Sequence, residues 1–240
     1  MVVRRLCMCV VLAACNSSSP AGSDGGNQPD VAEVDGEADA GPYLPPGYTL
    51  MPFLSTTPSY KFSAAQQVID SSHQYVGVLD TDVGVIVMQL LTDVAPITCN
   101  SFVFLTLNHF YDGVAFHRVI PGFMAQTGDP NTISMARSTW GLGGPGYMFG
   151  VELPDGGPTY DAAGVVGMAR EMNPDTNGSQ FFITFNAYPS LNGQYTVWAE
   201  VIQGLDVLPL IAVDETDDAG NDLGPPMTPT RIQQAYIGIK

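Results

Sequence analysis

Positive charge is the scarcest property of this sequence. Its 240 residues include 8 lysines and arginines against 24 aspartates and glutamates, and the formal net charge at pH 7 is −16. A protein that binds nucleic acid needs lysine and arginine side chains to neutralise phosphates. The composition therefore excludes nucleic acid as a partner. We interpret the negative charge as favouring solubility and self-repulsion, and we expect a monomer.

Cysteine is equally scarce. Three of the four cysteines (Cys7, Cys9 and Cys15) lie within the first 15 residues, which leaves Cys99 alone in the rest of the chain. The folded part therefore has no intramolecular disulfide available. We interpret Cys99, on a predicted helix, as a small buried hydrophobic residue. What the chain does have is a hydrophobic fraction of 45%, enough to build a core and to exclude global disorder.

The N-terminal apolar run, Leu6–Ala14, is too short to span a bilayer as a helix. It follows two arginines and ends in Leu-Ala-Ala-Cys15, which resembles the lipobox of bacterial lipoproteins. The resemblance implies that residues 1–14 are a signal peptide and that Cys15 carries a diacylglycerol, whose two acyl chains suffice for stable anchoring. We expect an exported protein held at the cell envelope, with no other membrane contact. The alternative is an ordinary secretory signal with a coincidental cysteine.

Residues 15–57 form a second segment, rich in Ser, Gly, Pro, Asp and Glu at its start. Such a composition cannot bury enough apolar surface to offset its ordering entropy, which predicts a disordered acidic linker. Its last part, Tyr43–Pro58, is more apolar, and the sequence leaves open whether that part packs on the domain. Residues 58–240 have a globular pattern and form the predicted domain.

Within the domain, alternation predicts a hairpin over residues 74–91, and helical spacing with an early proline predicts a helix over 92–108. A second helix is expected around Leu205–Val213, shortened unless Pro209 lies in its first turn. Many short strands with turn signals favour a closed, mostly antiparallel barrel. The further strands are predicted at Val114–Val119, Met124–Gln126, Val165–Met168, Phe181–Phe185, Thr196–Val201 and Ile232–Ile239.

Two motifs carry the strongest functional signal. FHRVIPGFMAQ spans residues 116–126, and NGSQFFIT spans residues 177–184. Their order and spacing resemble the cyclophilin family, and the resemblance covers the chain from Gln74 onward. It implies a closed eight-stranded antiparallel barrel capped by two helices, with the active site on its outer surface. It also implies peptidyl-prolyl cis–trans isomerase activity.

The resemblance assigns roles to matching positions. Arg118 matches the catalytic arginine, while Gln126 and the backbone near Ala169 match groups that hydrogen-bond the substrate main chain. Alternation points Phe116 and Phe181 into the core instead. The predicted site comprises the catalytic residues Arg118 and Gln126 and the substrate-binding residues Phe123, Met124, Ala169, Arg170, Gln180, Phe182, Leu191 and Tyr195.

The chemistry explains these residue types. The X–Pro bond isomerises slowly because amide resonance must be broken, at a barrier of roughly 18–20 kcal/mol. A catalyst need only bind the twisted state better than either planar isomer. A guanidinium can donate a hydrogen bond to the pyramidal imide nitrogen or stabilise the rotating carbonyl, while an apolar pocket holds the proline ring. The scheme requires no metal, cofactor or nucleophile.

Histidine offers no alternative chemistry in the sequence. His73 and His109 lack partners at metal-ligand spacing, and His117 is interpreted as a structural hydrogen-bonding residue. The segment DETDDAGND at 214–222 lacks the ordered spacing of a calcium loop, so we interpret it as a solvated turn.

The chain departs from the family at several positions. Tyr195 stands where the best-known eukaryotic members have His, and Arg170 stands where many have Asn. Ser190 replaces the Trp of cyclosporin-sensitive members, which predicts weak or no binding of that drug. An insertion at 131–141, with Arg137 and Trp140, lies beside the expected groove.

Two other functions compete with an isomerase of exported proteins. The same pocket suits a module that binds proline peptides or unfolded chains, with incidental turnover. Alternatively, the barrel is a scaffold whose partners recognise the 131–141 insertion.

Overall fold

The structure is a computed structural model that describes residues 42–216 and 222–240. The predicted signal peptide (1–14), the lipidation site Cys15 and the linker up to residue 41 lie outside the described residues. Within the described ranges, no helix is long and apolar enough to cross a membrane.

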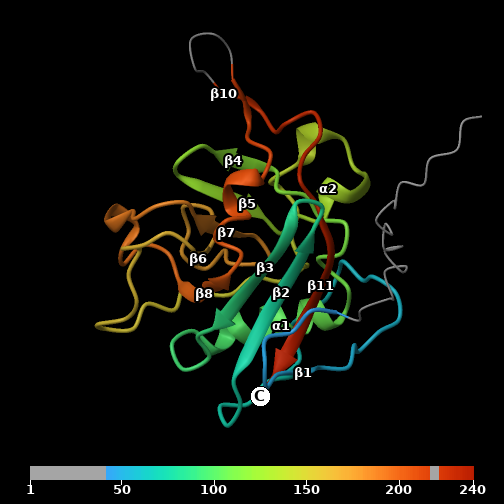
Figure 1. The fold of residues 1–240 in the computed structure, drawn as a ribbon, viewed down its shortest axis with the longest axis vertical. Helices are drawn as coiled ribbons and strands as arrows, with labels where there is room; N and C mark the ends of the chain where they lie inside the picture. Colours follow the sequence, from blue (N-terminus) through green and yellow to red (C-terminus); the bar gives the residue numbers. More distant parts are fainter. Residues whose placement is uncertain (1–41, 217–221) are drawn as a thin grey trace, which may run out of the picture. The chain divides into compact units, whose positions relative to one another are not determined.

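The fold is mostly β, with an antiparallel sheet and two α-helices, α1 (Pro96–Leu107) and α2 (Asn131–Ser134). The nine-stranded main sheet has the order β1-β11-β2-β3-β8-β6-β7-β5-β4 (Figure 1). A separate two-stranded pair is formed by β9 (Glu215–Thr216) and β10 (Asp222–Gly224). The strands of the main sheet are β1 (Thr49–Leu50), β2 (Tyr75–Thr81), β3 (Gly84–Leu90), β4 (Arg118–Ile120), β5 (Met124–Thr127), β6 (Val165–Met168), β7 (Phe181–Thr184), β8 (Val197–Gln203) and β11 (Ile232–Ile239).

The predicted hairpin is confirmed as β2 and β3, which pair in register from Val76↔Gln89 to Thr81↔Gly84. Both strands carry apolar side chains on both faces, and each face packs against other parts of the protein. Leu79, Ile86 and Met88 belong to the main core, which also includes half of the residues of α1. Val78 and Val87 belong to a smaller cluster on the other face. Burial on both faces explains why these strands read as nearly continuous apolar runs.

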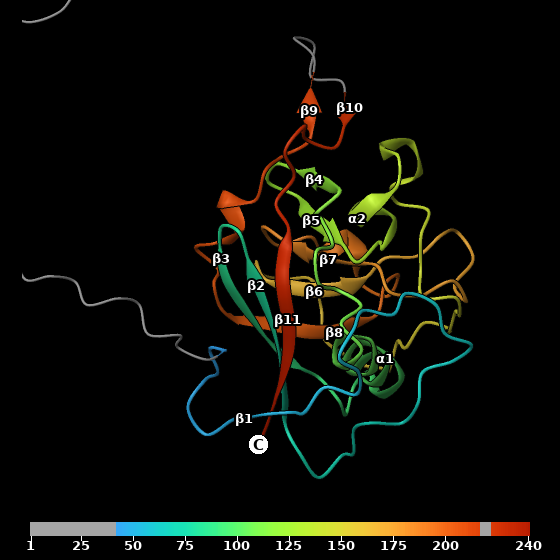
Figure 2. The same cartoon turned by 90° about the vertical axis from the view of Figure 1, so that its right-hand side faces the viewer.

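Helix α1 begins at Pro96, four residues later than predicted, with proline in its first turn. The residue before it, Ala95, has no side chain that could cap the helix. The first backbone amides instead donate to a distant carboxylate: the Ile97 and Thr98 N–H groups lie 2.9 and 2.8 Å from the Glu152 oxygens. The helix packs against β11 and β8 (Figure 2).

The predicted helix at Leu205–Val213 is wrong in extent. The chain forms only a 3₁₀ turn at Leu208–Leu210, with Pro209 in its first turn, and Ile211 is already extended. Proline has no N–H to donate to a helical hydrogen bond. No helix longer than this single turn forms around Pro209. The second α-helix is α2, which lies in the 131–141 insertion, where no helix was predicted.

The predicted strand Val114–Val119 is also corrected, because the ladder begins only at Arg118. Residues 113–116 instead bond to the segment before and at the start of β11. The Phe116 N–H donates to the Thr230 carbonyl at 2.9 Å, and the Ile232 N–H donates to the Val114 carbonyl at 2.9 Å. A single bridge joins Ala115 and Arg231. The described ladder does not continue across this point, so closure of the sheet into a barrel stays a prediction.

The last part of the predicted linker is ordered, which corrects the boundary at residue 57. Residues 49 and 50 form β1, which pairs with the end of β11 (Figure 2). Leu44, Tyr48 and Phe53 pack against the cluster of Val76, Val78, Val87 and Tyr236. The sheet therefore has seven strands at their predicted places, β4 at Arg118–Ile120 in place of Val114–Val119, and a ninth strand from this segment.

Candidate active site

The strand register places three predicted site residues on one face of the sheet. Arg118 on β4 opposes Gln126 on β5, and Gln126 opposes Phe182 on β7. The next partner in this row is Gly167 on β6. Directly opposed residues on antiparallel strands project to the same face. The row therefore brings a cation, an amide and an aromatic ring together from three strands.

The opposite face of the same strands belongs to the core. Val119, Ala125, Phe181 and Ile183 alternate with the site residues along β4, β5 and β7 and are fully buried in the main core. Phe116 is likewise buried there, as predicted. The alternation puts the site on the outer face of the sheet.

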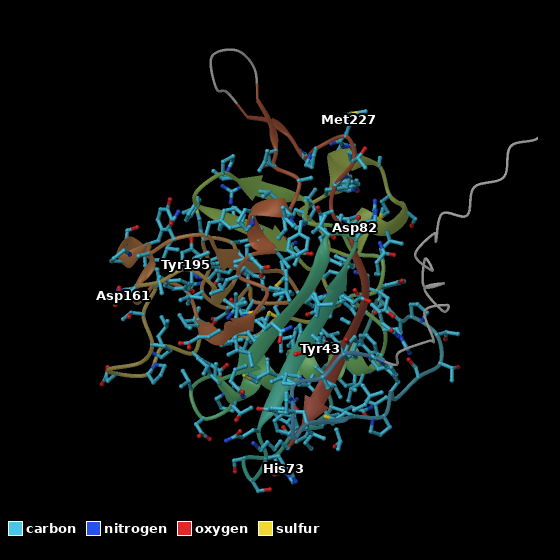
Figure 3. All side chains as sticks on the ribbon, in the orientation of Figure 1. Tyr43, His73, Asp82, Asp161, Tyr195 and Met227 are labelled. Atoms are coloured by element: carbon cyan, nitrogen blue, oxygen red, sulfur yellow. The ribbon has the colours of Figure 1, made fainter. Side chains whose placement is uncertain are left out.

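A groove of about 780 Å³ opens on this face. All ten residues of the predicted site lie in its lining, although they come from four separate stretches of the chain. Figure 3 labels one of them, Tyr195, which lies on the side of β6 and β8 and apart from Tyr43 and His73. These lining residues are Arg118, Phe123, Met124, Gln126, Ala169, Arg170, Gln180, Phe182, Leu191 and Tyr195.

An apolar pocket forms one part of the groove. Met124 and Phe182 are 2% and 6% exposed, so these walls are held in place by packing. The Phe182 ring stacks on Tyr160 (centroids 5.8 Å apart, 20° between planes) and meets Tyr195 edge-on at 5.6 Å. A Cβ at Gly167 would collide with both Phe182 and Tyr160, which explains glycine there.

Tyr160 is a site-supporting residue that sequence reasoning missed. It is fully buried behind Phe182, and its hydroxyl lies 3.4 Å from the Tyr195 carbonyl. Burial raises the pKa of its phenol well above the ordinary value. It is far in sequence from both motifs, so nothing in its local pattern indicated this role.

Arg118 is exposed and lines the groove, and no other described group of the protein occupies its guanidinium. Within the described residues it forms no hydrogen bond and no ion pair. An arginine remains protonated at any physiological pH and presents five N–H donors. These donors remain available to a bound molecule beside the apolar pocket.

A chain of side-chain hydrogen bonds fixes the middle of the groove. The Gln126 amide donates to Gln180 Oε1 at 3.0 Å, and Gln180 Nε2 donates to the carbonyls of Gly141 and Gly143 at 2.9 and 2.8 Å. The insertion therefore ends on the groove, where residues 141–143 form part of the lining.

The far rim is held by Arg170. Its guanidinium donates to the carbonyls of Gln194 and Glu171, each at 2.8 Å at the shortest, and lies 4.9 Å from the Tyr195 ring centroid. The neighbouring Ala169 N–H donates to the Gln180 carbonyl at 3.0 Å. The Arg170 side chain is thus tied to the backbone around it.

His117 lies beneath the groove and is 5% exposed. Neither ring nitrogen makes a hydrogen bond of full geometry in the described part of the chain, although the Ala115 backbone and the Gln180 side chain lie close enough to favour the protonated ring. Burial lowers its pKa below 6.5, with Asp129 opposing and Arg118 reinforcing the shift. His117 is therefore neutral at pH 7.

The described residues contain no group of three or more His, Cys, Asp or Glu side chains placed to hold a metal ion. Cys99 is buried, as predicted, and burial raises the pKa of its thiol strongly. The site thus consists of hydrogen-bonding groups, the unpartnered guanidinium of Arg118 and an apolar pocket.

Known proteins resemble this chain in sequence and in fold. Residues 76–237 match the family described as cyclophilin type peptidyl-prolyl cis-trans isomerase/CLD. Peptidyl-prolyl cis-trans isomerase-like 3 of Gallus gallus is 44% identical over 131 residues, or 54% of this chain and 77% of that protein. Peptidyl-prolyl cis-trans isomerase ppi1 of Schizosaccharomyces pombe is 37% identical over 150 residues, or 61% of this chain and 91% of that protein.

Two solved structures share the fold. A cyclophilin type isomerase of Cryptosporidium parvum, solved in the presence of the dipeptide Ala-Pro, is 30% identical, with a TM-score of 0.58 over 68% of this chain and 98% of that one. The cyclophilin AquaCyp293 of Hirschia baltica is 22% identical, with a TM-score of 0.54 over 68% of this chain and 76% of that one.

The chain belongs to the cyclophilin-type peptidyl-prolyl cis–trans isomerase family. Its activity is that of the family, cis–trans isomerisation of the peptide bond that precedes proline.

Proposed function

We propose that this groove rotates X–Pro bonds of exported proteins and that Arg118 is its catalytic residue. The observation that carries the assignment is a free guanidinium on the same sheet face as a preformed apolar pocket. The proline ring enters the pocket of Phe123, Met124, Phe182 and Leu191. A relative was crystallised in the presence of Ala-Pro, which supports a proline-containing ligand for the groove.

The mechanism needs only differential binding. In the twisted state the imide nitrogen becomes pyramidal and gains a lone pair that can accept a hydrogen bond from Arg118. Because the adjoining pocket excludes water, the charge interacts more strongly there than in bulk solvent. Gln126, held by Gln180, bonds the substrate main chain so that one side of the bond stays fixed while the other rotates.

The experiment is X–Pro exchange in an Ala-Pro-Phe peptide, measured by NMR with the wild-type chain, Arg118→Ala and Arg118→Lys. Loss of the guanidinium is expected to lower kcat/KM about 10²- to 10³-fold. Lysine should restore little, because its point charge cannot reproduce the planar fork. Melting temperatures should match the wild type, because Arg118 is exposed and unpartnered.

The outcome also separates the isomerase from a binding module. If the wild-type protein bound the peptide but did not accelerate its exchange, the result would favour a proline-peptide-binding or chaperone role. Acceleration that persists in Arg118→Ala would remove Arg118 from the mechanism.

We further propose that the protein is exported and anchored by lipid at Cys15. The support is the sequence of residues 1–15, with its basic start, short apolar run and terminal Ala-Ala-Cys. Metabolic labelling with a radioactive fatty acid in a bacterial host should mark the wild-type protein and leave Cys15→Ser unlabelled. Equal labelling of Cys9→Ser and Cys15→Ser, or of neither protein, would contradict the anchor.

A further inference from the structure

The few cations of this acidic chain are concentrated at the groove. The described residues contain six lysines and arginines, and three of them (Lys61, Arg118 and Arg170) line the groove. The remaining three are Arg137, Arg231 and Lys240. The chain as a whole carries three acidic residues for each basic one, so this concentration reverses the balance of charge at one place on the molecule.

None of the three groove cations is neutralised by a carboxylate. The Lys61 ammonium donates to the Gly144 carbonyl at 3.2 Å, and Arg170 bonds only backbone carbonyls. In the described ranges no lysine or arginine forms an ion pair. Their positive charge is therefore available to a ligand.

One acidic residue, Glu171, belongs to the groove lining. It is exposed and lies beyond 4 Å from every lysine and arginine nitrogen described. The lining thus carries three positive charges and one negative charge. A concave site lined mainly by one sign of charge concentrates ligands of the opposite sign.

Lys61 comes from outside the part of the chain that matches the family, which begins at residue 76. The adjoining backbone fixes its position, since the Phe62 N–H donates to the Pro145 carbonyl at 2.7 Å. The N-terminal segment therefore adds a cation to the stretch of groove formed by Gly143–Gly146.

We propose that the groove selects proline-containing segments that carry aspartate or glutamate close to the proline, and that Lys61 is a specificity-determining residue for them. The inference rests on the isomerase function proposed above. It concerns which X–Pro segments are preferred and leaves the role of Arg118 in the rotation as stated. The negative charge elsewhere on the protein repels such segments. It therefore increases the difference in affinity for them between the groove and the remaining surface.

The test compares three peptides that differ only in the two residues flanking an Ala-Pro core: Glu, Gln or Lys. The readout is kcat/KM for exchange with the full chain at low and high salt. We expect the Glu peptide to exceed the Lys peptide by about tenfold at low ionic strength, with the ratio shrinking at 0.5 M NaCl, roughly a 4 Å screening length. Peptides with glutamate on one side only then locate the preference before or after the proline.

Variants assign the effect to the groove. Lys61→Met should lower the Glu/Lys ratio about threefold, and Glu171→Gln should raise it. The matched control is Lys240→Met, which removes the same charge at the C-terminus, away from Tyr195 in Figures 1 and 3. Lys240→Met should leave the ratio unchanged.

Two results would overturn the inference: equal kcat/KM for the Glu and Lys peptides, or equal changes in the ratio for Lys61→Met and Lys240→Met. Failure of the isomerase proposal looks different, because the neutral Gln peptide would then show no acceleration at all.

Discussion

At the scale of single residues, the site depends on side chains whose partners come from elsewhere in the chain. Gln180 illustrates this point. Its sequence position within NGSQFFIT indicates a polar group near the groove, but its two donor bonds to residues 141 and 143 depend on the path of the insertion. Gln180 therefore joins the site to the loop that most distinguishes this chain.

We predict that Gln180→Glu lowers kcat/KM about tenfold and loosens the loop. The carboxylate can still accept from Gln126 but cannot donate to the two carbonyls, which would lose their partner. Amide hydrogen exchange of residues 141–144 should become faster. Gln194→Glu adds the same charge at an exposed position outside the lining and serves as the control; equal loop exchange in both variants would contradict the prediction.

His117 makes the stability of the protein depend on pH. Because burial lowers its folded-state pKa below 6.5, the unfolded chain binds a proton that the folded chain resists. The stabilising effect of the neutral ring is therefore complete above pH 6.5 and is lost as the pH falls below that value. Asp129 and Arg118 are the charged groups that act on the ring, in opposite directions.

We predict that the free energy of unfolding falls between pH 7 and pH 5, with a contribution from His117 of up to about 1.4 kcal/mol per pH unit. His117→Asn should flatten this part of the profile in urea titrations. His73→Asn, at an exposed ring, is the matched control. A profile that is equally steep in wild type and His117→Asn would show that other groups carry the dependence.

At the scale of elements, helix α1 shows how a helix terminus can be satisfied from a distance. The sequence before Pro96 offers no capping side chain, and the cap is Glu152, which lies 54 residues beyond Thr98. Its carboxylate accepts from two backbone amides and from the Thr98 hydroxyl at 2.7 Å. A negative charge at a helix N-terminus also interacts favourably with the helix dipole.

Replacing Glu152 by glutamine is expected to lower the free energy of unfolding by about 1 kcal/mol, because the uncharged amide is a weaker acceptor and brings unwanted donors. Equilibrium urea unfolding measures the change. Glu200→Gln, an exposed position on β8, should stay within about 0.5 kcal/mol of wild type. A similar loss in both variants would argue against the cap.

At the scale of the whole molecule, the segment before the family match is part of the fold. Residues 44–53 cover the face of β2, β3 and β11 that lies away from the main core, and β1 extends the sheet. The segment then continues to Lys61 and reaches the groove. Removal of residues 44–53 should therefore lower the stability of the fold more than it changes the groove.

We predict that an internal deletion of residues 42–57 lowers the free energy of unfolding by roughly 2–5 kcal/mol, because Leu44, Tyr48 and Phe53 no longer cover Val78 and its neighbours. Thermal and urea unfolding measure the loss. An equally long deletion of residues 16–31, whose composition cannot build a core, should leave the melting temperature unchanged. Equal stability of the two deletions would mean that the segment adds nothing to the fold.

The sequence by itself predicted most of the strands and named the residues that line the groove. Alternation in a strand fixes which side chains share a face, and the observed pairing of β4, β5 and β7 then places Arg118 and Gln126 beside Phe182. Sequence reasoning was weaker where distant partners decide the outcome. It overextended the helix at Leu205–Val213 and missed α2.

Only the tertiary structure decided the remaining features: the cap by Glu152, the support of Phe182 by Tyr160, the buried ring of His117 and the reach of Lys61 into the groove. Each depends on contacts between segments at least 20 residues apart or on the burial that such contacts create. Local propensity and periodicity describe neighbouring residues, whereas hydrogen bonding, burial and electrostatic fields depend on what the folded chain brings close. For this reason the sequence indicated the chemistry, and the fold determined which residues support and surround the groove.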